Sequence, residues 1–148
     1  LSLIAAVSAV VNGGVLMQPY LVERVLNPDD SVYRQIMPCP IRRVCSEVTS
    51  EKVRRLLHNV VEHGTGHAAR IPGVAVGGKT GTAQIWDPNQ KKWLDEHLVS
   101  FLLVAPVDKQ PEFVILVTAR NPKIGQYGSD VAAPVARRIA AYMLKKRG

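Results

Sequence analysis

Apolar residues recur along the chain with two periods, and the longer period predicts helices. Residues 3–12 are almost entirely apolar and precede a pair of glycines, which predicts a buried helix that ends there. Further on, apolar residues recur at the spacing of one and two helical turns, which predicts an amphipathic helix. We expect Thr49 or Ser50 to cap that helix and Gly64 and Gly66 to end it. Its apolar face consists of Val53, Leu56, Leu57, Val60 and Val61.

The shorter period and several unbroken apolar runs predict strands. Residues 20–26 and 31–36 are short strand-like runs on either side of an Asn-Pro-Asp-Asp turn signal. Residues 74–85 alternate loosely and predict a strand interrupted by glycines, a feature that often marks close approach of a ligand to the backbone. The apolar runs 98–107 and 112–120 are joined by a short polar link and predict a hairpin of strands covered on both faces.

The remaining segments complete a mixed α+β pattern. Residues 130–146 have a proline in the first turn, apolar residues on one face and basic residues at the end, which predicts a helix. The Pro-rich segment 37–43 and the polar segment 86–97 are predicted to be loops. Trp86 and Trp93 in the second loop could line a cleft, but we expect them to cover the core. The order of helix, two short strands, helix, three strands and helix indicates an antiparallel β-sheet flanked by helices.

Composition limits the chain to one domain or a large piece of one. It has 148 residues, of which 47% are hydrophobic. The first apolar helix begins without a methionine, a basic segment or a capping residue, so we expect the chain to be a fragment that starts just before a helix. That helix is too short to cross a bilayer, which needs about 20 apolar residues. The net charge of +7 is scattered and aromatics are scarce, which argues against nucleic-acid binding and for a basic surface.

Two cysteines and several histidines raise the question of a metal site. Cys39 and Cys45 could form a disulfide in an exported protein or remain as free thiols, and the sequence leaves both open. Adding His58, His63 and His67 gives no standard zinc spacing. We therefore expect no metal and no cofactor.

One glycine-rich segment fits two incompatible motifs. Residues 73–80 match the phosphate-binding pattern G-x-x-x-x-G-K-[ST], and they also contain the first two residues of a Lys-Thr-Gly element found in serine-acylating enzymes. A phosphate loop needs a buried strand before it and a helix after it. Here Pro72 lies just before the first glycine, and Gly-Thr-Ala-Gln follows the threonine. We therefore disfavour nucleotide binding and expect Lys79 to lie on a strand at the edge of a cleft.

Three segments together resemble a known family. They are GTGHAARIPGVAVGGKTGTAQ, SFLLVAPVDKQPEFVILV and YGSDVAAPVARRI. In order and spacing they resemble the C-terminal half of penicillin-binding-protein transpeptidase domains, and the Lys-Thr-Gly-Thr-Ala-Gln form is most similar to the class B, monofunctional members. The resemblance covers nearly the whole chain and is weakest over residues 27–50. It implies that residues 1–148 are the C-terminal portion of one transpeptidase domain with the penicillin-binding/serine β-lactamase-like fold.

The resemblance also implies roles for four residues. Lys79 would supply positive potential to the site and to the terminal carboxylate of the substrate, which Thr80 and Thr82 would hydrogen-bond. Gly81 would leave room for a substrate lying antiparallel to the strand. The backbone N–H of Thr82 would be one half of the oxyanion hole. The family's Ser-x-x-Lys and Ser-x-Asn motifs do not occur in this chain, so the nucleophile must come from a segment outside it.

The implied function is part of a serine-type D,D-transpeptidase that cross-links peptidoglycan. It would act through an acyl-enzyme on D-Ala-D-Ala stem peptides, and β-lactams would acylate the same serine. Two alternatives stay open: a non-catalytic β-lactam sensor and, much less favoured, a P-loop nucleotide-binding module. Expected partners are the N-terminal remainder of the protein and other cell-wall synthesis proteins. The expected location is the extracytoplasmic face of the bacterial inner membrane, with an N-terminal anchor outside this chain.

Overall fold

The computed structural model describes residues 1–125 and 127–147 and has an α+β fold, as the sequence predicts. Three longer strands form one antiparallel sheet in the order β5-β6-β7, and four shorter strands form two separate pairs, β1-β4 and β2-β3. The elements are α1 (Ser2–Val11), β1 (Val15–Met17), β2 (Arg24–Leu26), β3 (Val32–Gln35), β4 (Pro40–Arg43), α2 (Glu47–His63), the 3-10 turn η1 (His67–Ala69), β5 (Gly77–Asp87), β6 (Lys92–Ala105), β7 (Phe113–Arg120) and α3 (Gly128–Arg147).

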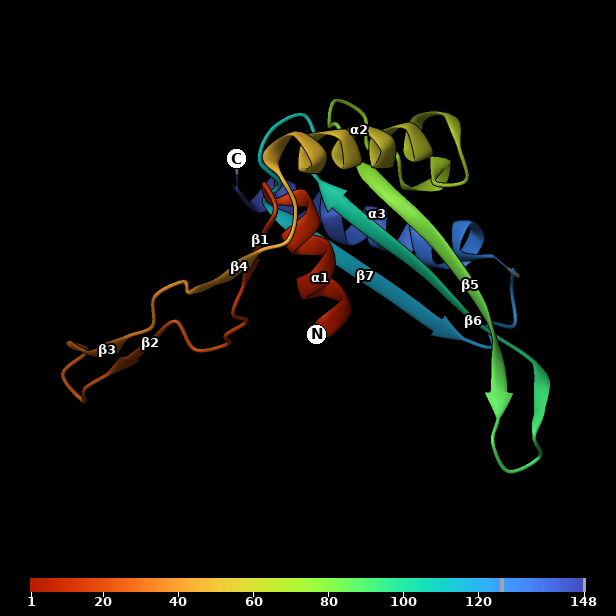
Figure 1. Ribbon diagram of the computed structural model, residues 1–148, viewed down its shortest axis with the longest axis horizontal. Coiled ribbons are helices and arrows are strands. Elements are labelled where there is room, and N and C mark those ends of the chain that lie inside the picture. Colours follow the sequence, from red (N-terminus) through yellow and green to blue (C-terminus); the bar gives the residue numbers. More distant parts are fainter. Residues whose placement is uncertain (126, 148) are drawn as a thin grey trace.

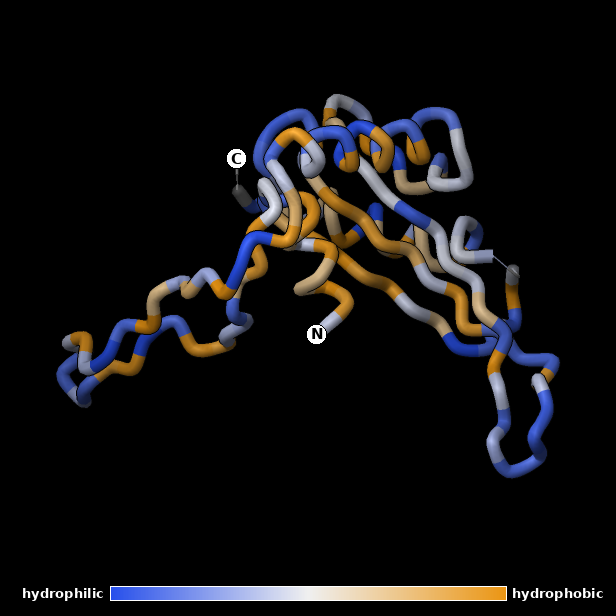
Figure 2. The backbone as a smooth tube through the Cα atoms, viewed as in Figure 1, coloured by the Kyte–Doolittle hydropathy of each residue, from blue (hydrophilic) through white to orange (hydrophobic). Residues whose placement is uncertain are grey.

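Helices lie on both faces of the main sheet. Helix α3 runs behind β6 and β7, α1 lies in front, and α2 crosses the end where β5 begins (Figure 1). Apolar residues follow the central parts of β6 and β7, whereas the far end of the β5–β6 hairpin is polar (Figure 2). The prediction that the 98–120 hairpin is a pair of covered strands is therefore confirmed for its central part.

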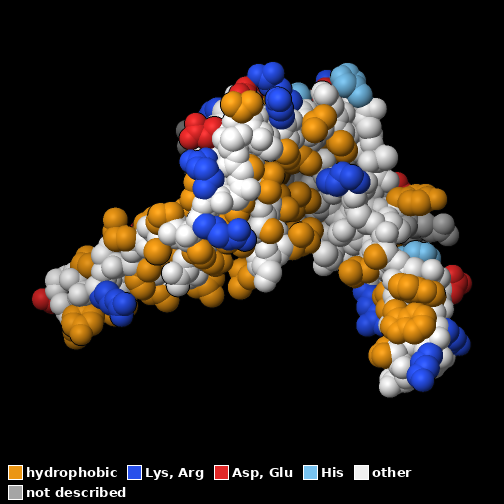
Figure 3. Space-filling model, in the orientation of Figure 1, with side chains coloured by type: hydrophobic (Ala, Val, Ile, Leu, Met, Phe, Trp, Pro, Cys, Tyr) orange, Lys and Arg blue, Asp and Glu red, His pale blue; other side chains and the backbone are white. Residues whose placement is uncertain are grey.

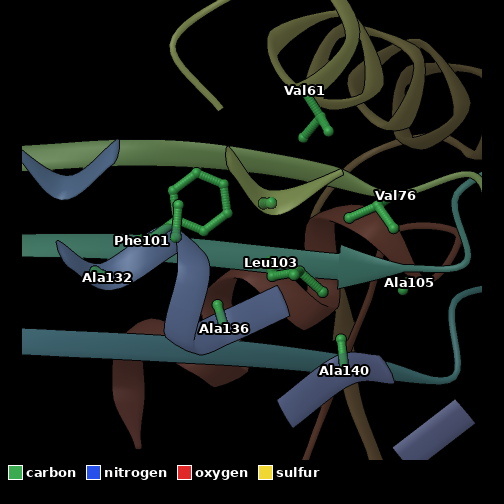
Figure 4. Close-up of a cluster of buried hydrophobic side chains, with 10 residues drawn as sticks. Val61, Val76, Phe101, Leu103, Ala105, Ala132, Ala136 and Ala140 are labelled. Carbon is green, nitrogen blue, oxygen red and sulfur yellow. The ribbon is translucent and has the colours of Figure 1, made fainter. Parts of the chain in front are cut away.

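The core depends on the alternation of side chains along β6. Phe101, Leu103 and Ala105 are fully buried and point to the α3 side, where they meet small residues of that helix and Val61 of α2 (Figure 4). The small residues are Ala132, Ala133, Ala136 and Ala140. Because alanine side chains are short, α3 can pack close to the sheet. On the other face, Val104 packs against Val11 of α1.

The segment between α1 and α2 differs from the prediction of two short strands. The hairpin around the turn is present as β2 and β3, but residues 40–43 were expected to be a loop and instead form β4, paired antiparallel with β1. Pro40 can begin this strand because the first residue of a strand needs no ladder N–H. The β2–β3 hairpin projects away from the main sheet as an arm (Figure 1).

The turn of this arm is held by side-chain hydrogen bonds. Asp29 Oδ1 accepts a hydrogen bond of 2.6 Å from the Ser31 hydroxyl and another of 3.1 Å from the Ser31 backbone N–H. These bonds, the hydroxyl first, hold the pKa of the Asp29 carboxyl below its usual value. The Asn-Pro-Asp-Asp turn expected from the sequence is therefore confirmed.

The expectation that the two tryptophans cover the core is wrong. Residues 86–97 are not mainly a loop, because β5 extends to Asp87 and β6 begins at Lys92. Trp86 is 45% exposed and Trp93 is 60% exposed. The two strands continue past the ends of the helices, so no layer lies over them there (Figure 1).

The beginning of α2 also differs from the prediction. Ser46, rather than Thr49 or Ser50, caps the helix by accepting a hydrogen bond of 3.1 Å from the Thr49 N–H, and Gly64 ends it as expected. Ser50 lies inside the helix, fully buried, and accepts a hydrogen bond of 2.9 Å from the Gly13 N–H. This bond ties the end of α1 to α2. None of the helices in the described part of the chain is long and apolar enough to cross a membrane.

Replacing Ser50 with alanine should therefore destabilise the protein. Ser50→Ala leaves the Gly13 N–H without its buried acceptor, a loss of about 1–3 kcal/mol in the free energy of unfolding. Ser2→Ala, at an exposed position on α1, is the matched control and should change stability by less than about 0.5 kcal/mol. Urea unfolding followed by circular dichroism measures both. Equal midpoints for the two variants would show that the Ser50–Gly13 bond contributes nothing.

Candidate active-site strand

Strand β5 carries the four residues singled out by the sequence, and glycines fix its position. A Cβ at Gly77 would lie 2.9 Å from Leu57 Cβ of α2, and one at Gly78 would lie 2.7 Å from Phe101 Cε1. Real side chains do not approach so closely, so larger residues here would push the strand away from α2 or from Phe101. The two glycines therefore let β5 lie between the helix and the core.

The local structure excludes a phosphate loop around Lys79. Strand β5 begins at Gly77 and continues through Lys79 and Thr80 to Asp87. A phosphate loop requires a helix to begin at the Lys-Thr pair, because the N–H groups of its first turn hold the phosphate. The segment therefore lacks the geometry of a phosphate loop, and the strand predicted there is confirmed.

The four residues occupy the edge strand of the sheet, with side chains alternating between its faces. Lys79 lies opposite Leu102 and Gly81 opposite Ser100, on the face toward α1, whereas Thr80 lies opposite Phe101 on the face toward α3. Thr82 shares the α3 face. Among the described residues, no strand pairs with the outer edge of β5. That edge is open to an added extended chain.

The polar groups of Lys79 and Thr80 have partners nearby. Lys79 is exposed, and its Nζ donates a hydrogen bond of 2.9 Å to the Thr80 carbonyl oxygen. The Thr80 hydroxyl lies 3.0 Å from the hydroxyl of Thr65, in the loop after α2. A hydroxyl can donate one hydrogen bond and accept two, so Thr65 leaves Thr80 capacity for a further partner. Thr65 was not singled out by the sequence, because its contact with Thr80 forms only in the fold.

Two further residues lie directly beside the candidate strand. Ser100 of β6 donates a hydrogen bond of 3.4 Å to the Gly81 carbonyl oxygen, and its Oγ occupies the space where a Gly81 side chain would lie. A Cβ at Gly128, the first residue of α3, would overlap the Ser100 carbonyl oxygen and lie 3.1 Å from the Gly81 carbonyl oxygen. The helix start thus packs directly on the backbone of the site. The sequence feature that could have pointed to Gly128 is its position two residues before Asp130, the acidic residue of the first turn of α3.

This arrangement suits recognition of an extended peptide with a carboxylate. An open strand edge offers backbone groups to an added strand, a mode of peptide binding that many proteins use. An exposed lysine and two threonine hydroxyls near the edge can attract and hydrogen-bond a negative group. The chain contains no Ser-x-x-Lys pair, so it supplies no serine nucleophile of that type beside these residues.

Comparison with known proteins assigns the family. Residues 1–141 match the model of the penicillin-binding-protein transpeptidase domain. The chain belongs to this family. It is 41% identical to stage V sporulation protein D of Bacillus subtilis and 32% identical to penicillin-binding protein PbpB of Mycobacterium tuberculosis. The alignments cover 98% and 93% of the chain but 22% of each relative, so the chain spans about a fifth of their length.

Solved structures of family members share the fold. Penicillin-binding protein 3 of M. tuberculosis, solved in complex with aztreonam, matches with a TM-score of 0.83 and 31% identity over 97% of this chain and 34% of that one. The D,D-transpeptidase domain of an Eggerthella lenta peptidoglycan glycosyltransferase matches with a TM-score of 0.81 and 31% identity, over 97% of this chain and 31% of that one. The transpeptidase family and its fold, expected from the sequence, are therefore confirmed.

The contact at Gly128 gives a test of how the site strand is supported. Gly128→Ala would force α3 away from the backbone of β5 and β6, and overpacking of this kind costs about 1–3 kcal/mol. Ser129→Ala, one residue further along, is the matched control and should stay within about 0.5 kcal/mol of the parent. Thermal unfolding measures the difference. An unchanged melting temperature for Gly128→Ala would mean that close packing of the start of α3 on the strand does not contribute to stability.

Proposed function

We propose that residues 1–148 form the C-terminal portion of one serine-type D,D-transpeptidase domain that cross-links peptidoglycan stem peptides. The observation that carries this proposal is the placement of Lys79, Thr80, Gly81 and Thr82 on an open edge strand, in a chain of the transpeptidase family. Relatives named peptidoglycan D,D-transpeptidase support the reaction. The nucleophilic serine belongs to a part of the protein outside this chain.

The reaction divides into two acyl transfers. The serine oxygen attacks the carbonyl carbon between the last two residues of a D-Ala-D-Ala stem, its proton passes to the leaving amine, and the terminal D-Ala departs. An amine of a neighbouring stem peptide then attacks the ester and releases the serine. A β-lactam acylates the same serine when its ring opens, and no group leaves. Both paths pass through an oxyanion that needs hydrogen-bond donors.

The four residues of the strand take different roles in this scheme, and Thr82 takes two. Lys79 supplies positive potential, and the hydroxyls of Thr80 and Thr82 bind the terminal carboxylate. The Thr82 backbone N–H stabilises the oxyanion together with the N–H of the serine. Thr65 supports the binding of the carboxylate, because its hydroxyl contacts that of Thr80. When Thr65 donates in this contact, the Thr80 hydroxyl keeps its own proton for a carboxylate. Gly81 was expected to leave room for the substrate, but the Ser100 hydroxyl occupies the space where its side chain would lie, so the glycine makes room for Ser100 on that face.

The remainder of the domain has a place to pack. An apolar groove runs between α1 and the β1–β4 pair, and hydrophobic side chains are visible around it (Figure 3). Helix α1 covers part of the sheet face to which Lys79 points. The solved transpeptidase domain of Burkholderia pseudomallei penicillin-binding protein 3 includes much more than the matched region, since this chain covers 41% of it. We infer that the serine-bearing part packs on this face, toward Lys79.

The cellular setting follows from the same proposal. The substrate is peptidoglycan, so the domain acts on the extracytoplasmic side of the bacterial inner membrane. An N-terminal segment outside this chain would hold it there, and other cell-wall synthesis proteins would be its partners. Relatives named for sporulation and as penicillin-binding proteins support a cell-wall setting.

Labelled penicillin tests the proposal directly. The complete transpeptidase should be acylated, and residues 1–148 alone should form no adduct because they lack the nucleophile. Lys79→Ala in the complete protein should slow acylation by about 100- to 1,000-fold, the loss expected for a group that stabilises the transition state. Its melting temperature should change little, since Lys79 is exposed.

Lys52→Ala, at an exposed position on α2, is the control and should be acylated at the parent rate. An adduct on the isolated chain, or parent-like acylation of Lys79→Ala, would refute the assigned roles. Acylation without any cross-linking of stem peptides would favour a β-lactam sensor instead.

Two substitutions at Thr82 separate its side chain from its backbone. Thr82→Ala keeps the N–H and should lose only a hydroxyl contact, with a cost of about 1 kcal/mol or somewhat more to a charged group. Thr82→Pro removes the N–H, and the loss of one oxyanion donor slows the reaction about 100- to 1,000-fold. Acylation rates measured with one β-lactam show whether the hydroxyl or the backbone N–H of Thr82 matters more. The comparison holds if both variants unfold cooperatively near the melting temperature of the parent. Equal rates for the two folded variants would place the oxyanion donor elsewhere.

A further inference from the structure

The far end of the β5–β6 hairpin carries a pair of exposed tryptophans with no role in the scheme above. Trp86 and Trp93 lie directly opposite each other on the two strands. Their ring centroids are 5.2 Å apart and the rings meet edge to face at 67°. Because 45% of Trp86 and 60% of Trp93 are exposed, a large part of each side chain is accessible. Hydrophobic side chains gather on the face of the projecting hairpin that Figure 3 shows. We call these two residues the tryptophan pair.

The pair sits on a polar hairpin that projects beyond the helices (Figures 1 and 2). Cross-strand packing of the rings helps to hold the hairpin together, but that purpose does not require so much exposed aromatic surface. Exposed aromatic surface on an otherwise polar element is typical of a binding site. An indole has an electron-rich face and one N–H donor. This combination suits a pyranose ring. Its C–H groups can pack on the face of the indole, and its hydroxyl or acetamide oxygens can accept a hydrogen bond from the indole N–H.

The direction of the strand brings one particular sugar polymer to the pair. A stem peptide bound antiparallel to β5 runs from the Asp87 end toward the Gly77 end, because β5 itself runs from Gly77 to Asp87. Its C-terminal carboxylate then lies near Thr80 and Thr82, and its N-terminus points toward Trp86. In peptidoglycan the N-terminus of the stem is the end attached to the glycan.

The lengths agree with this direction. Trp86 is four residues beyond Thr82, which corresponds to about 13 Å along a strand. The part of a stem peptide that precedes the reacting D-Ala, about three residues, spans roughly 10 Å when extended. The link to the sugar adds a few bonds. A peptide whose reacting carbonyl lies at Thr82 therefore brings its sugar to the tryptophan pair.

We propose that the tryptophan pair is a stacking surface for the acetylated amino-sugar rings of the glycan strand that carries the stem peptide. This inference rests on the proposed function and extends it, since it assigns the recognition of the glycan to a surface separate from Lys79–Thr82. The pair would hold the polymer while the peptide lies along β5. It would thus favour stems attached to glycan over free peptides.

The two tryptophans provide their own probe, because each indole carries an N–H whose NMR signal responds to a ligand that contacts the ring. The probe ligand is a peptide-free oligosaccharide of alternating N-acetylglucosamine and N-acetylmuramic acid, prepared by removing the stems with an amidase. Titration into the complete transpeptidase, labelled with ¹⁵N at its indoles, should shift the N–H signals of Trp86 and Trp93 saturably. These two signals are assigned by their loss in Trp86→Phe and Trp93→Phe. Absence of a saturable change would overturn the proposal, since a pair that only braces the hairpin does not respond to sugar.

Variants and a second ligand sharpen the test. Trp93→Ala should weaken the affinity by about tenfold or more, whereas Trp93→Phe keeps an aromatic face and should retain most of it. Tyr33→Ala removes an exposed aromatic residue on the distant β2–β3 arm and should leave the affinity at the parent value. A stem peptide without sugar should shift the indole signals less than the oligosaccharide does. An equal or larger shift with the peptide would overturn the assignment to glycan.

The glycan surface and the transpeptidase function can be refuted independently of each other. A β-lactam carries no glycan, so acylation of the complete transpeptidase tests the catalytic site alone. Normal acylation with no response of the indoles to the oligosaccharide would refute the glycan surface and leave the transpeptidase assignment intact. No acylation would refute the transpeptidase assignment, whatever the indoles do.

Discussion

The position of β5 depends on close backbone packing that only glycine allows. Gly77 and Gly78 bring the strand against α2 and Phe101, and Gly81 and Gly128 bring it against Ser100 and the start of α3. Each of these contacts lies within or directly beside the segment that carries Lys79, Thr80 and Thr82. The strand is therefore held firmly on its inner side while its outer edge stays free. Such support helps a strand edge to bind its substrate in a single register, because the backbone of the supported strand cannot shift.

Much of the fold could be predicted because it depends on local periodicity. The helix spacing around Leu57 and Val61 and the apolar runs on either side of Pro111 each specify one element without reference to the rest of the chain. The strand at Lys79 could be placed for the same reason, since glycine, proline and β-forming residues around it exclude a helix. The motif at that strand then pointed to the transpeptidase family, which the comparisons confirm.

The parts that could not be predicted depend on contacts between distant segments. Strand β4 forms because it pairs with β1, whereas the prolines at its start and just before it, Pro40 and Pro38, indicate a loop. Ser46, Thr49 and Ser50 all lie within about one turn of helix, so the sequence alone does not decide which one caps α2. The exposure of the tryptophan pair depends on where the helices end relative to the hairpin. Thr65, Ser100 and Gly128 come to the site strand only through tertiary packing.

The free edge of β5 has a consequence for the solubility of the protein. An unpaired strand edge that accepts a peptide is equally able to pair with the same edge of another molecule, which is a common route to aggregation. Antiparallel pairing of two copies centred on Lys79 would place two ammonium groups opposite each other, and like charges at such positions destabilise a ladder. The lysine thus discourages self-association of the edge and attracts a carboxylate-bearing peptide. The same charge therefore favours a carboxylate-bearing peptide at the edge and disfavours a second copy of the protein paired in this register.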